Sequence, residues 1–180
     1  MSCRTGRIAG LVGFGIAGVL AATAANGVGW NLTNSEPPGL WRTAGAALPA
    51  TLGEYVAACP PRSGVVALAA RRGYIAPGDC PTGLTPLLKQ VAAVAGDTVR
   101  VTDAGISVNG RPLPRTAQLA SDSRGRPLPH VPPGTYQVAP GTVWLLSTYN
   151  ARSFDSRYFG PVPVATLRAR LRPIAVEHRR

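Results

Sequence analysis

An uncharged run of residues from Ile8 to Trp30 constrains this chain more than any other feature of its sequence. About 20 apolar residues are enough to cross the hydrocarbon core of a bilayer, and this run meets that length. Arg4 and Arg7 precede the run, and the next charged residue is Glu36. The positive-inside rule therefore predicts a single-pass anchor with a cytoplasmic N-terminus, and it places everything after Trp30 outside.

A cleavable signal peptide is the alternative, because Ala22-Thr23-Ala24 provides the small residues of a cleavage site. The mean hydropathy of the chain is only +0.08, and no second long apolar run follows, so a multi-span membrane protein is excluded. We accordingly divide the chain into an anchor or signal sequence over residues 1–30, an outer domain over residues 31–176 and a basic tail over residues 177–180.

Glycine and proline punctuate the outer domain. The chain has 21 Gly and 18 Pro, a density typical of many short strands joined by turns rather than of a helix bundle. Short apolar or alternating segments predict strands at 54–56, 65–68, 87–94, 98–101, 106–108, 135–138 and 142–147. Asn109-Gly110 predicts a hairpin end after the 106–108 strand. The tail from 162 to 176 alternates enough to be a strand or a short helix. Apart from the 65–68 strand, residues 57–83 are predicted as a loop, and residues 111–133 as a proline-rich insertion. The predicted fold class is mainly β.

The chain carries a formal net charge of +11, almost entirely from arginine. Of its 19 cationic residues only Lys89 is a lysine. The arginines are scattered and no aromatic residues are interleaved with them, so we do not expect a nucleic-acid groove. We expect instead a solvated surface that faces anionic lipid. Arginine keeps its proton in proteins and a buried lysine can lose it. The single lysine is therefore a candidate for chemistry that needs a neutral amine.

The three cysteines divide between the two sides of the predicted anchor. Cys59 and Cys80 lie outside, 21 residues apart, where an oxidising compartment favours a disulfide between them. Cys3 lies inside. Neither His130 nor His178 has a neighbouring ligand at a usable spacing, so we expect no metal site and no cofactor.

Several familiar catalytic motifs are absent from the sequence. It has no Gly-x-Ser-x-Gly elbow, no phosphate-binding Walker loop, no His-Glu-x-x-His and no Ser-x-x-Lys. The two histidines lie in the proline-rich insertion and among the last residues, which are poor positions for a rigid general base. A Ser-His-Asp triad is therefore not expected.

Three segments together carry a resemblance to a known family. They are residues 31–41 (NLTNSEPPGLW), 86–99 (PLLKQVAAVAGDTV) and 150–162 (NARSFDSRYFGPV). In this order and spacing they resemble the signal peptidase I family, whose members use a serine–lysine dyad. Their form looks like the conjugative-transfer branch of that family, the TraF-type peptidases that mature pilin subunits. The resemblance implies an antiparallel β-sheet or barrel catalytic domain in the periplasm, anchored in the bacterial inner membrane.

The resemblance implies a role for each of two residues. Ser35 occupies the position of the nucleophile, and Lys89 occupies that of the general base, which a serine hydroxyl needs nearby. In a strand, Lys89 shares its face with Leu87, Val91 and Ala93. Apolar neighbours disfavour the ammonium form and lower the pKa of a lysine, which suits a base.

Supporting residues are implied in the same way. Thr33 matches a position that supplies a hydroxyl to the oxyanion, beside the backbone N–H of Ser35. Ser153 matches a serine that hydrogen-bonds the catalytic lysine. Asp155 and Arg157 match an ion pair that supports the site.

Two departures from the family pattern weaken a general leader-peptidase interpretation. Ser147-Thr148-Tyr149 stands where Gly-Asp-Asn is usual, and Glu36 stands where Met is usual. A further segment, Asp122-Ser123-Arg124, repeats the Asp-Ser-Arg of residues 155–157. It lies in the proline-rich insertion without strand context, and we predict an ordinary loop there.

The resemblance also implies partners. The substrate would be a membrane-held propilin or preprotein, and the other partners would be membrane lipid and a conjugative transfer apparatus. Some members of the branch pass the acyl group to the N-terminal amine of the substrate and make a circular pilin, and the sequence leaves hydrolysis and cyclisation open. A housekeeping leader peptidase and an inactive structural component of the apparatus are the alternatives.

Overall fold

The computed structural model describes residues 27–177 of the 180-residue chain. Most of the anchor predicted over residues 8–30 lies outside the described residues. Its last residues do not continue a helix, because Val28–Asn31 form strand β1 and pair with a neighbouring strand. No helix within residues 27–177 is long and apolar enough to cross a membrane.

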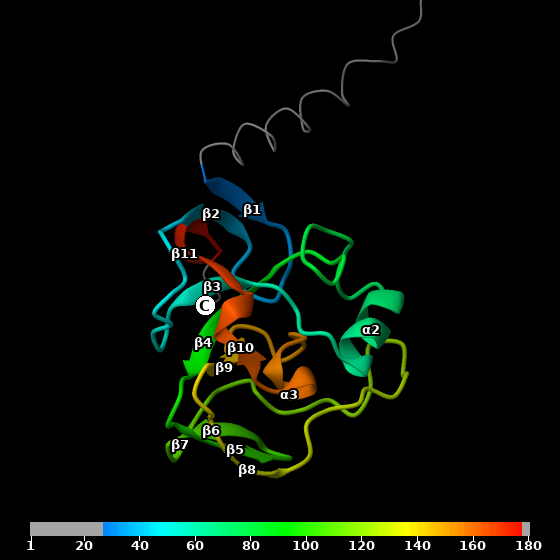
Figure 1. Cartoon of the computed structure of the whole chain (residues 1–180). Helices are drawn as coiled ribbons and strands as arrows, with labels where there is room; N and C mark the ends of the chain where they lie inside the picture. The colour runs from blue at the N-terminus through cyan, green and yellow to red at the C-terminus, as the bar shows by residue number, and fades with distance from the viewer. Residues whose placement is uncertain (1–26, 178–180) are drawn as a thin grey trace, which may run out of the picture.

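A seven-stranded antiparallel sheet forms the larger part of the molecule (Figure 1). Its strands in spatial order are β1 (Val28–Asn31), β2 (Gly39–Thr43), β11 (Leu167–Val176), β3 (Tyr55–Ala58), β4 (Leu87–Ala93), β9 (Thr142–Leu146) and β10 (Val162–Pro163). The tail, which the sequence left open between strand and helix, is therefore mostly strand. β11 lies between β2 and β3 and pairs with both, so it connects the β1–β2 pair to the rest of the sheet.

A second antiparallel sheet has four strands and lies at the lower end of Figure 1. Its order is β7 (Arg111–Pro112), β6 (Gly105–Val108), β5 (Thr98–Thr102) and β8 (Gly134–Gln137). The turn between β6 and β7 contains Asn109 and Gly110, with φ angles of 50° and 79°. Asn-Gly tolerates this left-handed geometry, which confirms the hairpin end that the sequence predicted.

The two sheets share one apolar cluster. Trp144 and Leu146 of β9 pack in it with Val99, Val101 and Ile106 of the small sheet, and all five are at most 2% exposed. The alternation of apolar residues along the strands directs these side chains to a common interior. The small sheet is therefore packed onto the end of β4 and β9, beyond the site described below.

One predicted strand is instead a helix. Residues 65–68 lie in α2 (Gly64–Arg71), and the Ser63 side chain caps it by accepting a hydrogen bond from the Val66 N–H at 3.3 Å. Val66 and Ala69 face the core. An N-cap serine and alanine-rich continuation outweigh the β preference of two valines.

Two shorter helical elements are α3 (Ser156–Phe159) and the 3₁₀ turn η1 (Val164–Thr166). The predicted disulfide is present between Cys59 and Cys80, with 5.5 Å between their Cα atoms. It encloses α2, which packs with α3 and Phe154 on one side of the large sheet (Figure 1). Residues 113–133 contain no strand or helix, and an isolated bridge joins Ser121 to Pro127.

Candidate active site

Ser35 lies in the loop between β1 and β2, and the side chain of Asn31 shapes this loop. Asn31 Oδ1 accepts hydrogen bonds from the Thr33 N–H at 3.1 Å and the Thr33 hydroxyl at 2.7 Å. Its amide nitrogen donates to the carbonyl oxygens of Glu36 at 2.9 Å and Pro37 at 3.1 Å. One asparagine therefore ties both ends of the loop, as short polar side chains do in turns.

A segment from the other end of the chain holds the same loop. The hydroxyl of Ser147 donates to the backbone carbonyl of Ser35. The amide of Asn150 donates to the carbonyl of Asn34 at 2.7 Å. These bonds orient the Ser35 backbone relative to the end of β9, across more than a hundred residues of sequence.

Lys89 lies on β4, opposite Val56 of β3, and is 1% exposed. Lys89, Val91 and Ala93 occupy the buried face of the strand, as the alternation predicted. Burial lowers the pKa of the Lys89 ammonium, although the charges of Asp155 and Glu36 oppose this shift. Among the described residues, no ion pair within 4.0 Å involves Lys89.

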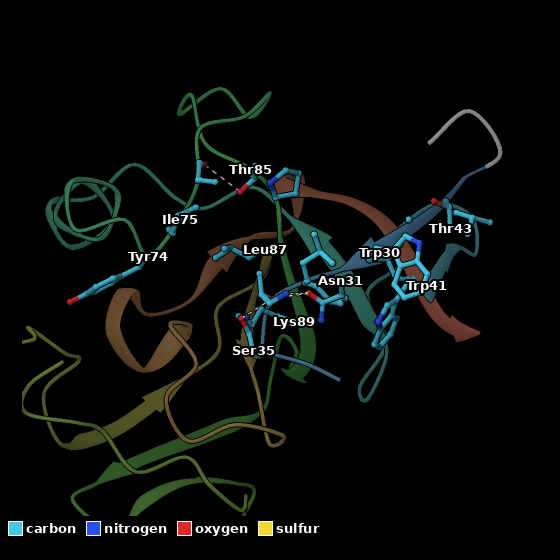
Figure 2. Close-up of a pocket in the computed structure, with 18 of the residues that line it drawn as sticks. Trp30, Asn31, Ser35, Trp41, Thr43, Tyr74, Ile75, Thr85, Leu87 and Lys89 are labelled. Atoms are coloured by element: carbon cyan, nitrogen blue, oxygen red, sulfur yellow. Dashed lines mark hydrogen bonds between the residues drawn. The ribbon is translucent and has the colours of Figure 1, made fainter. Parts of the chain in front are cut away.

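Ser35, Lys89 and Thr33 line one pocket of about 690 Å³ (Figure 2). Its other walls come from β1 and β2, from the residues after α2, and from the start of β4, including Trp30, Trp41, Ile75 and Leu87. The Thr33 and Ser35 hydroxyl oxygens are 3.4 Å apart. The structure thus brings the predicted nucleophile, base and oxyanion threonine to one cavity with largely apolar walls.

Asp155 and Arg157 form the predicted ion pair, and both are fully buried. The Arg157 guanidinium donates to the two carboxylate oxygens of Asp155, at 2.8 Å each. Asp155 caps α3 by accepting from the Arg157 N–H, and it also accepts from the Ser147 N–H at 3.1 Å. The pair therefore fixes Ser147, which in turn holds the carbonyl of Ser35.

The predicted hydrogen bond from Ser153 to Lys89 is absent. Ser153 is 2% exposed, and its hydroxyl oxygen is buried without a hydrogen-bond partner. Its backbone is held on both sides, because its N–H donates to the Asn150 carbonyl and its own carbonyl accepts from Arg157. These bonds fix the serine where its side chain does not reach the amine.

Three residues of the site were not singled out from the sequence. Asn31 had a local signal, since Asn-x-Thr is a pattern of side-chain-capped turns. Ser147 and Glu36 were noticed only as departures from a family pattern. Glu36 is 1% exposed, and burial raises its pKa to about 8 although the charge of Lys89 opposes the rise.

Asp122, predicted to lie in an ordinary loop, anchors the insertion to the residues after α2. Its carboxylate accepts from the Tyr74 hydroxyl, from the Arg126 side chain at 2.7 Å and from two backbone N–H groups. Burial alone would raise the pKa of Asp122, but these hydrogen bonds hold it below its usual range. Asp122 and Tyr74 line a second pocket of about 260 Å³, which also reaches Ser35.

Comparisons with known proteins agree with this geometry. The profile of a family described as "Signal peptidase, peptidase S26" matches residues 5–175 of the chain. A plasmid transfer protein TraF from Escherichia coli is 41% identical over 168 residues, which are 92% of this chain and 93% of that protein. A probable conjugal transfer protein TraF from Sinorhizobium fredii is 43% identical over 150 residues, which are 82% of this chain and 77% of the relative.

Among solved structures, a signal peptidase I from Enterococcus faecalis V583 is similar at 19% sequence identity. The match covers 67% of this chain and 94% of that one, with a TM-score of 0.37.

Proposed function

The chain belongs to the signal peptidase family, peptidase S26, and from that premise we propose that it is a serine endopeptidase with Ser35 as nucleophile and Lys89 as general base. The family and its TraF members are those that the three sequence segments indicated, so that resemblance is confirmed. One observation carries the proposal: both side chains line the same pocket, and the lysine is 1% exposed.

The chemistry follows from these positions. The neutral amine of Lys89 takes the hydroxyl proton while Ser35 Oγ attacks the carbonyl carbon of the scissile bond. As the tetrahedral intermediate collapses, the C–N bond breaks and the Lys89 ammonium gives the proton to the leaving amine. The acyl-enzyme on Ser35 then reacts with water, which releases an acid, or with the N-terminal amine of the substrate, which closes a ring. In either case Lys89 accepts a proton from the attacking group and gives it to Ser35 Oγ as the ester C–O bond breaks, which restores the free enzyme.

The oxyanion donors in this proposal are the Ser35 N–H and the Thr33 hydroxyl. In the free protein the Thr33 hydroxyl donates to Asn31 at 2.7 Å, so it has to rotate toward the oxyanion. Asp155 and Arg157 act through Ser147, whose hydroxyl holds the Ser35 carbonyl and thereby orients the N–H groups of the loop. Preorganised donors of this kind supply much of the rate enhancement in acyl transfer.

The substrate in this proposal is the propilin of a conjugative transfer apparatus. The similar proteins are named for plasmid and conjugal transfer, which supports this assignment over a housekeeping leader peptidase. The uncharged run that precedes β1 would anchor the enzyme in the bacterial inner membrane, with its pocket on the periplasmic side. A membrane-held propilin would then reach Ser35 a few residues beyond the anchor.

Propilin processing in cells that carry Lys89→Arg tests the dyad. Arginine keeps the charge and much of the length but cannot act as a base, so we expect processing to fall by at least about 10³-fold. Gln90→Ala is the matched control on the same strand, because Gln90 lies outside the pocket and only donates to the Gly53 carbonyl. Unimpaired processing by Lys89→Arg would exclude Lys89 as the base.

A general leader-peptidase preprotein, supplied in the same cells, tests the substrate. We expect the wild-type protein to cleave the propilin and to leave the preprotein uncut. Cleavage of the preprotein alone would assign the enzyme to housekeeping secretion. Full-length propilin in wild-type cells, with the protein folded and accumulated, would favour an inactive structural component.

A further inference from the structure

The second pocket, of about 260 Å³, has no role in the mechanism above, although Ser35 lines it. Four residues line both this pocket and the first pocket of about 690 Å³: Ser35, Tyr74, Ile75 and Leu87. Of the two pockets, Thr33 and Lys89 line only the first. In Figure 2, Tyr74 lies on one side of Ser35, and Trp30 and Trp41 of the first pocket lie on the other. The proposed nucleophile therefore lies where two cavities meet.

A substrate that is cut at Ser35 has residues on both sides of the scissile bond. The acyl half has to stay beside Ser35 and the oxyanion donors until the acyl-enzyme is resolved, so it belongs in the first pocket, which Thr33 lines. The half that departs has to continue past Ser35 in another direction, and the second pocket opens there. Pockets for drug-sized ligands span about 300–1,000 Å³, so a smaller one suits a short segment of one or two residues.

The walls of the second pocket are largely apolar and held in place. Its apolar and aromatic lining residues are Ile75, Leu87, Leu119, Leu128, Phe154 and Tyr158. The rings of Phe154 and Tyr158 are stacked, with centroids 5.4 Å apart and planes 6° apart. The Tyr158 hydroxyl accepts a hydrogen bond from the Leu119 N–H at 3.3 Å. The cavity is therefore formed before a substrate arrives, and it suits an apolar side chain.

Two charged residues line the second pocket, Asp122 and Arg152. The carboxylate of Asp122 already accepts hydrogen bonds from the Tyr74 hydroxyl, the Arg126 side chain and two backbone N–H groups. Arg152 is exposed, and within residues 27–177 no ion pair up to 4.0 Å involves its guanidinium. The charge that the pocket offers to a ligand is therefore positive.

The backbone of Arg152 is tied to the loop that carries Ser35. The Arg152 N–H donates to Asn150 Oδ1 at 2.9 Å, and the Asn150 amide donates to the carbonyl of Asn34 at 2.7 Å. The same asparagine thus holds the residue before the nucleophile and the residue that carries the free positive charge. A substrate that is seated on Ser35 meets Arg152 at a defined position.

We propose that the second pocket is a subsite for the departing segment of the substrate, and that it selects an apolar side chain followed by a carboxylate, which Arg152 binds. This inference rests on the proposed function, because it takes Ser35 as the nucleophile. The planar guanidinium matches a carboxylate with two parallel hydrogen bonds. The carboxylate can belong to an acidic side chain or to the C-terminus of a substrate that is cut close to its end. Arg152 is then a specificity-determining residue that does not touch the reacting atoms.

Three small probes test the subsite without any cleavage. Acetyl-leucyl-glutamate amide carries a side-chain carboxylate, acetyl-leucyl-alanine carries a terminal one, and acetyl-leucyl-glutamine amide carries neither. Each is titrated into the full-length Ser35→Ala protein in detergent micelles, with the leucine methyl groups labelled with ¹³C. Leu119 and Leu128 line only the second of the two pockets, and Leu171 lines only the first. We expect the Leu119 and Leu128 signals to shift, and at least one carboxylate probe to bind about two- to five-fold tighter than the neutral probe, as for an exposed ion pair. The tighter of the two carboxylate probes identifies the source of the carboxylate.

Variants of Arg152 test the residue itself. Arg152→Ala should abolish the preference for a carboxylate, and Arg152→Lys, which keeps the charge, should retain most of it. Arg100→Ala is the matched control, because Arg100 is exposed on β5 and lines neither pocket. Thermal unfolding checks that each variant folds. In the active enzyme, Arg152→Ala should lower kcat/KM for propilin about two- to five-fold, and Arg100→Ala should leave it unchanged.

The outcomes separate this inference from the proposed function. Probes that leave Leu119 and Leu128 unmoved, or that bind alike with and without a carboxylate, overturn the subsite even if Lys89-dependent propilin cleavage is found. A preference for the carboxylate that is lost in Arg152→Ala supports the subsite, even if no propilin is cleaved and the peptidase assignment fails. If processed pilin moves the Leu119 and Leu128 signals as full-length propilin does, the pocket holds the acyl half, and the assignment to the departing segment is overturned.

Discussion

At the scale of single residues, the candidate site depends on a relay of buried polar contacts behind the pocket. Arg157 binds Asp155, Asp155 accepts from the backbone of Ser147, and Ser147 donates to the carbonyl of Ser35. Arg157, Asp155 and Ser147 are fully buried, so loss of one of these three leaves another polar group desolvated. Such a relay makes the position of the nucleophile depend on residues that never touch the substrate.

Asp155→Asn should show how much the relay contributes to stability. The substitution leaves the fully buried Arg157 without its counter-ion, which typically costs about 3–5 kcal/mol. Urea unfolding of the wild type and the variant measures this difference. The double variant Asp155→Asn with Arg157→Met removes the stranded charge and should recover part of the loss. A single variant within about 1 kcal/mol of the wild type would contradict a tightly desolvated pair.

Glu36 gives a prediction for stability against pH. Its pKa is raised from 4.5 to about 8 in the folded protein, so between these values the folded state holds a proton that the unfolded state releases. The contribution of Glu36 is therefore present below pH 4.5 and is lost as the pH rises toward 8. Glu36→Gln does not titrate. The unfolding free energy of Glu36→Gln, relative to that of the wild type, should therefore increase from pH 5 to pH 8 by an amount on the order of a few kcal/mol.

Urea unfolding of both proteins at pH 5, 6.5 and 8 measures this gain. The charge of Lys89 opposes the rise in the pKa of Glu36, so the same series in a Lys89→Met background separates the contributions of the two residues. A difference between Glu36→Gln and the wild type that is constant with pH would show that Glu36 titrates alike in the folded and unfolded states.

At the scale of elements, hydrogen bonds hold the proline-rich insertion against the residues that follow α2. Asp122 binds Tyr74, just beyond α2, and Arg126 within the insertion itself. The Arg72 guanidinium lies 3.8 Å from the same carboxylate and donates to the carbonyl of Pro127 at 2.8 Å. Asp122 and Tyr74 form part of the wall of the second pocket, which also reaches Ser35. The disulfide between Cys59 and Cys80 in turn ties the segment that carries α2 to the large sheet.

Asp122→Asn should loosen the insertion without unfolding the sheets. The amide removes the charge that Arg126 and Arg72 face, so local opening becomes more frequent and trypsin should cut the bond between Arg124 and Gly125 several-fold faster. Asp103→Asn, in the exposed turn between β5 and β6, is the matched control and should leave the cleavage rate unchanged. Equal rates in all three proteins would show that Asp122 does not restrain the insertion.

At the scale of the whole molecule, the two sheets form one packing unit. Trp144 is 1% exposed and lies between them, with its ring centroid 5.7 Å from that of Tyr136 on β8. Ala93 of β4 and Trp144 and Leu146 of β9 belong to the backbone ladder of the large sheet, and their side chains pack with those of the small sheet. Loss of packing at this junction should therefore affect both sheets.

Trp144→Ala tests this cooperativity. Truncation of a buried tryptophan should cost about 3–5 kcal/mol. Trp30 on β1 and Trp41 on β2 remain as fluorescent reporters of the large sheet. The unfolding midpoint that their fluorescence gives in urea should fall together with the midpoint measured by far-UV circular dichroism. Separate transitions would show that the small sheet unfolds independently.

Much of the fold followed from local patterns. Alternation along residues 87–93 predicted a strand with Lys89 on its buried face, and Asn109-Gly110 predicted a hairpin end. The helix α2 was missed because a run of four apolar residues suits a strand or a helix segment equally. The capping hydrogen bond at Ser63 decides for the helix, and capping geometry is seen only in the folded chain.

By itself, the sequence determined that the chain is mainly β, that Lys89 is the only lysine and lies on an apolar face, and that Cys59 and Cys80 pair. These properties depend on neighbours in sequence or on residue type. Only the tertiary structure decided that Glu36 is buried and that Ser147 holds Ser35, because this contact joins the β1–β2 loop to the segment after β9. Contacts between segments this far apart in the chain arise only when the sheet assembles, so no local pattern records them.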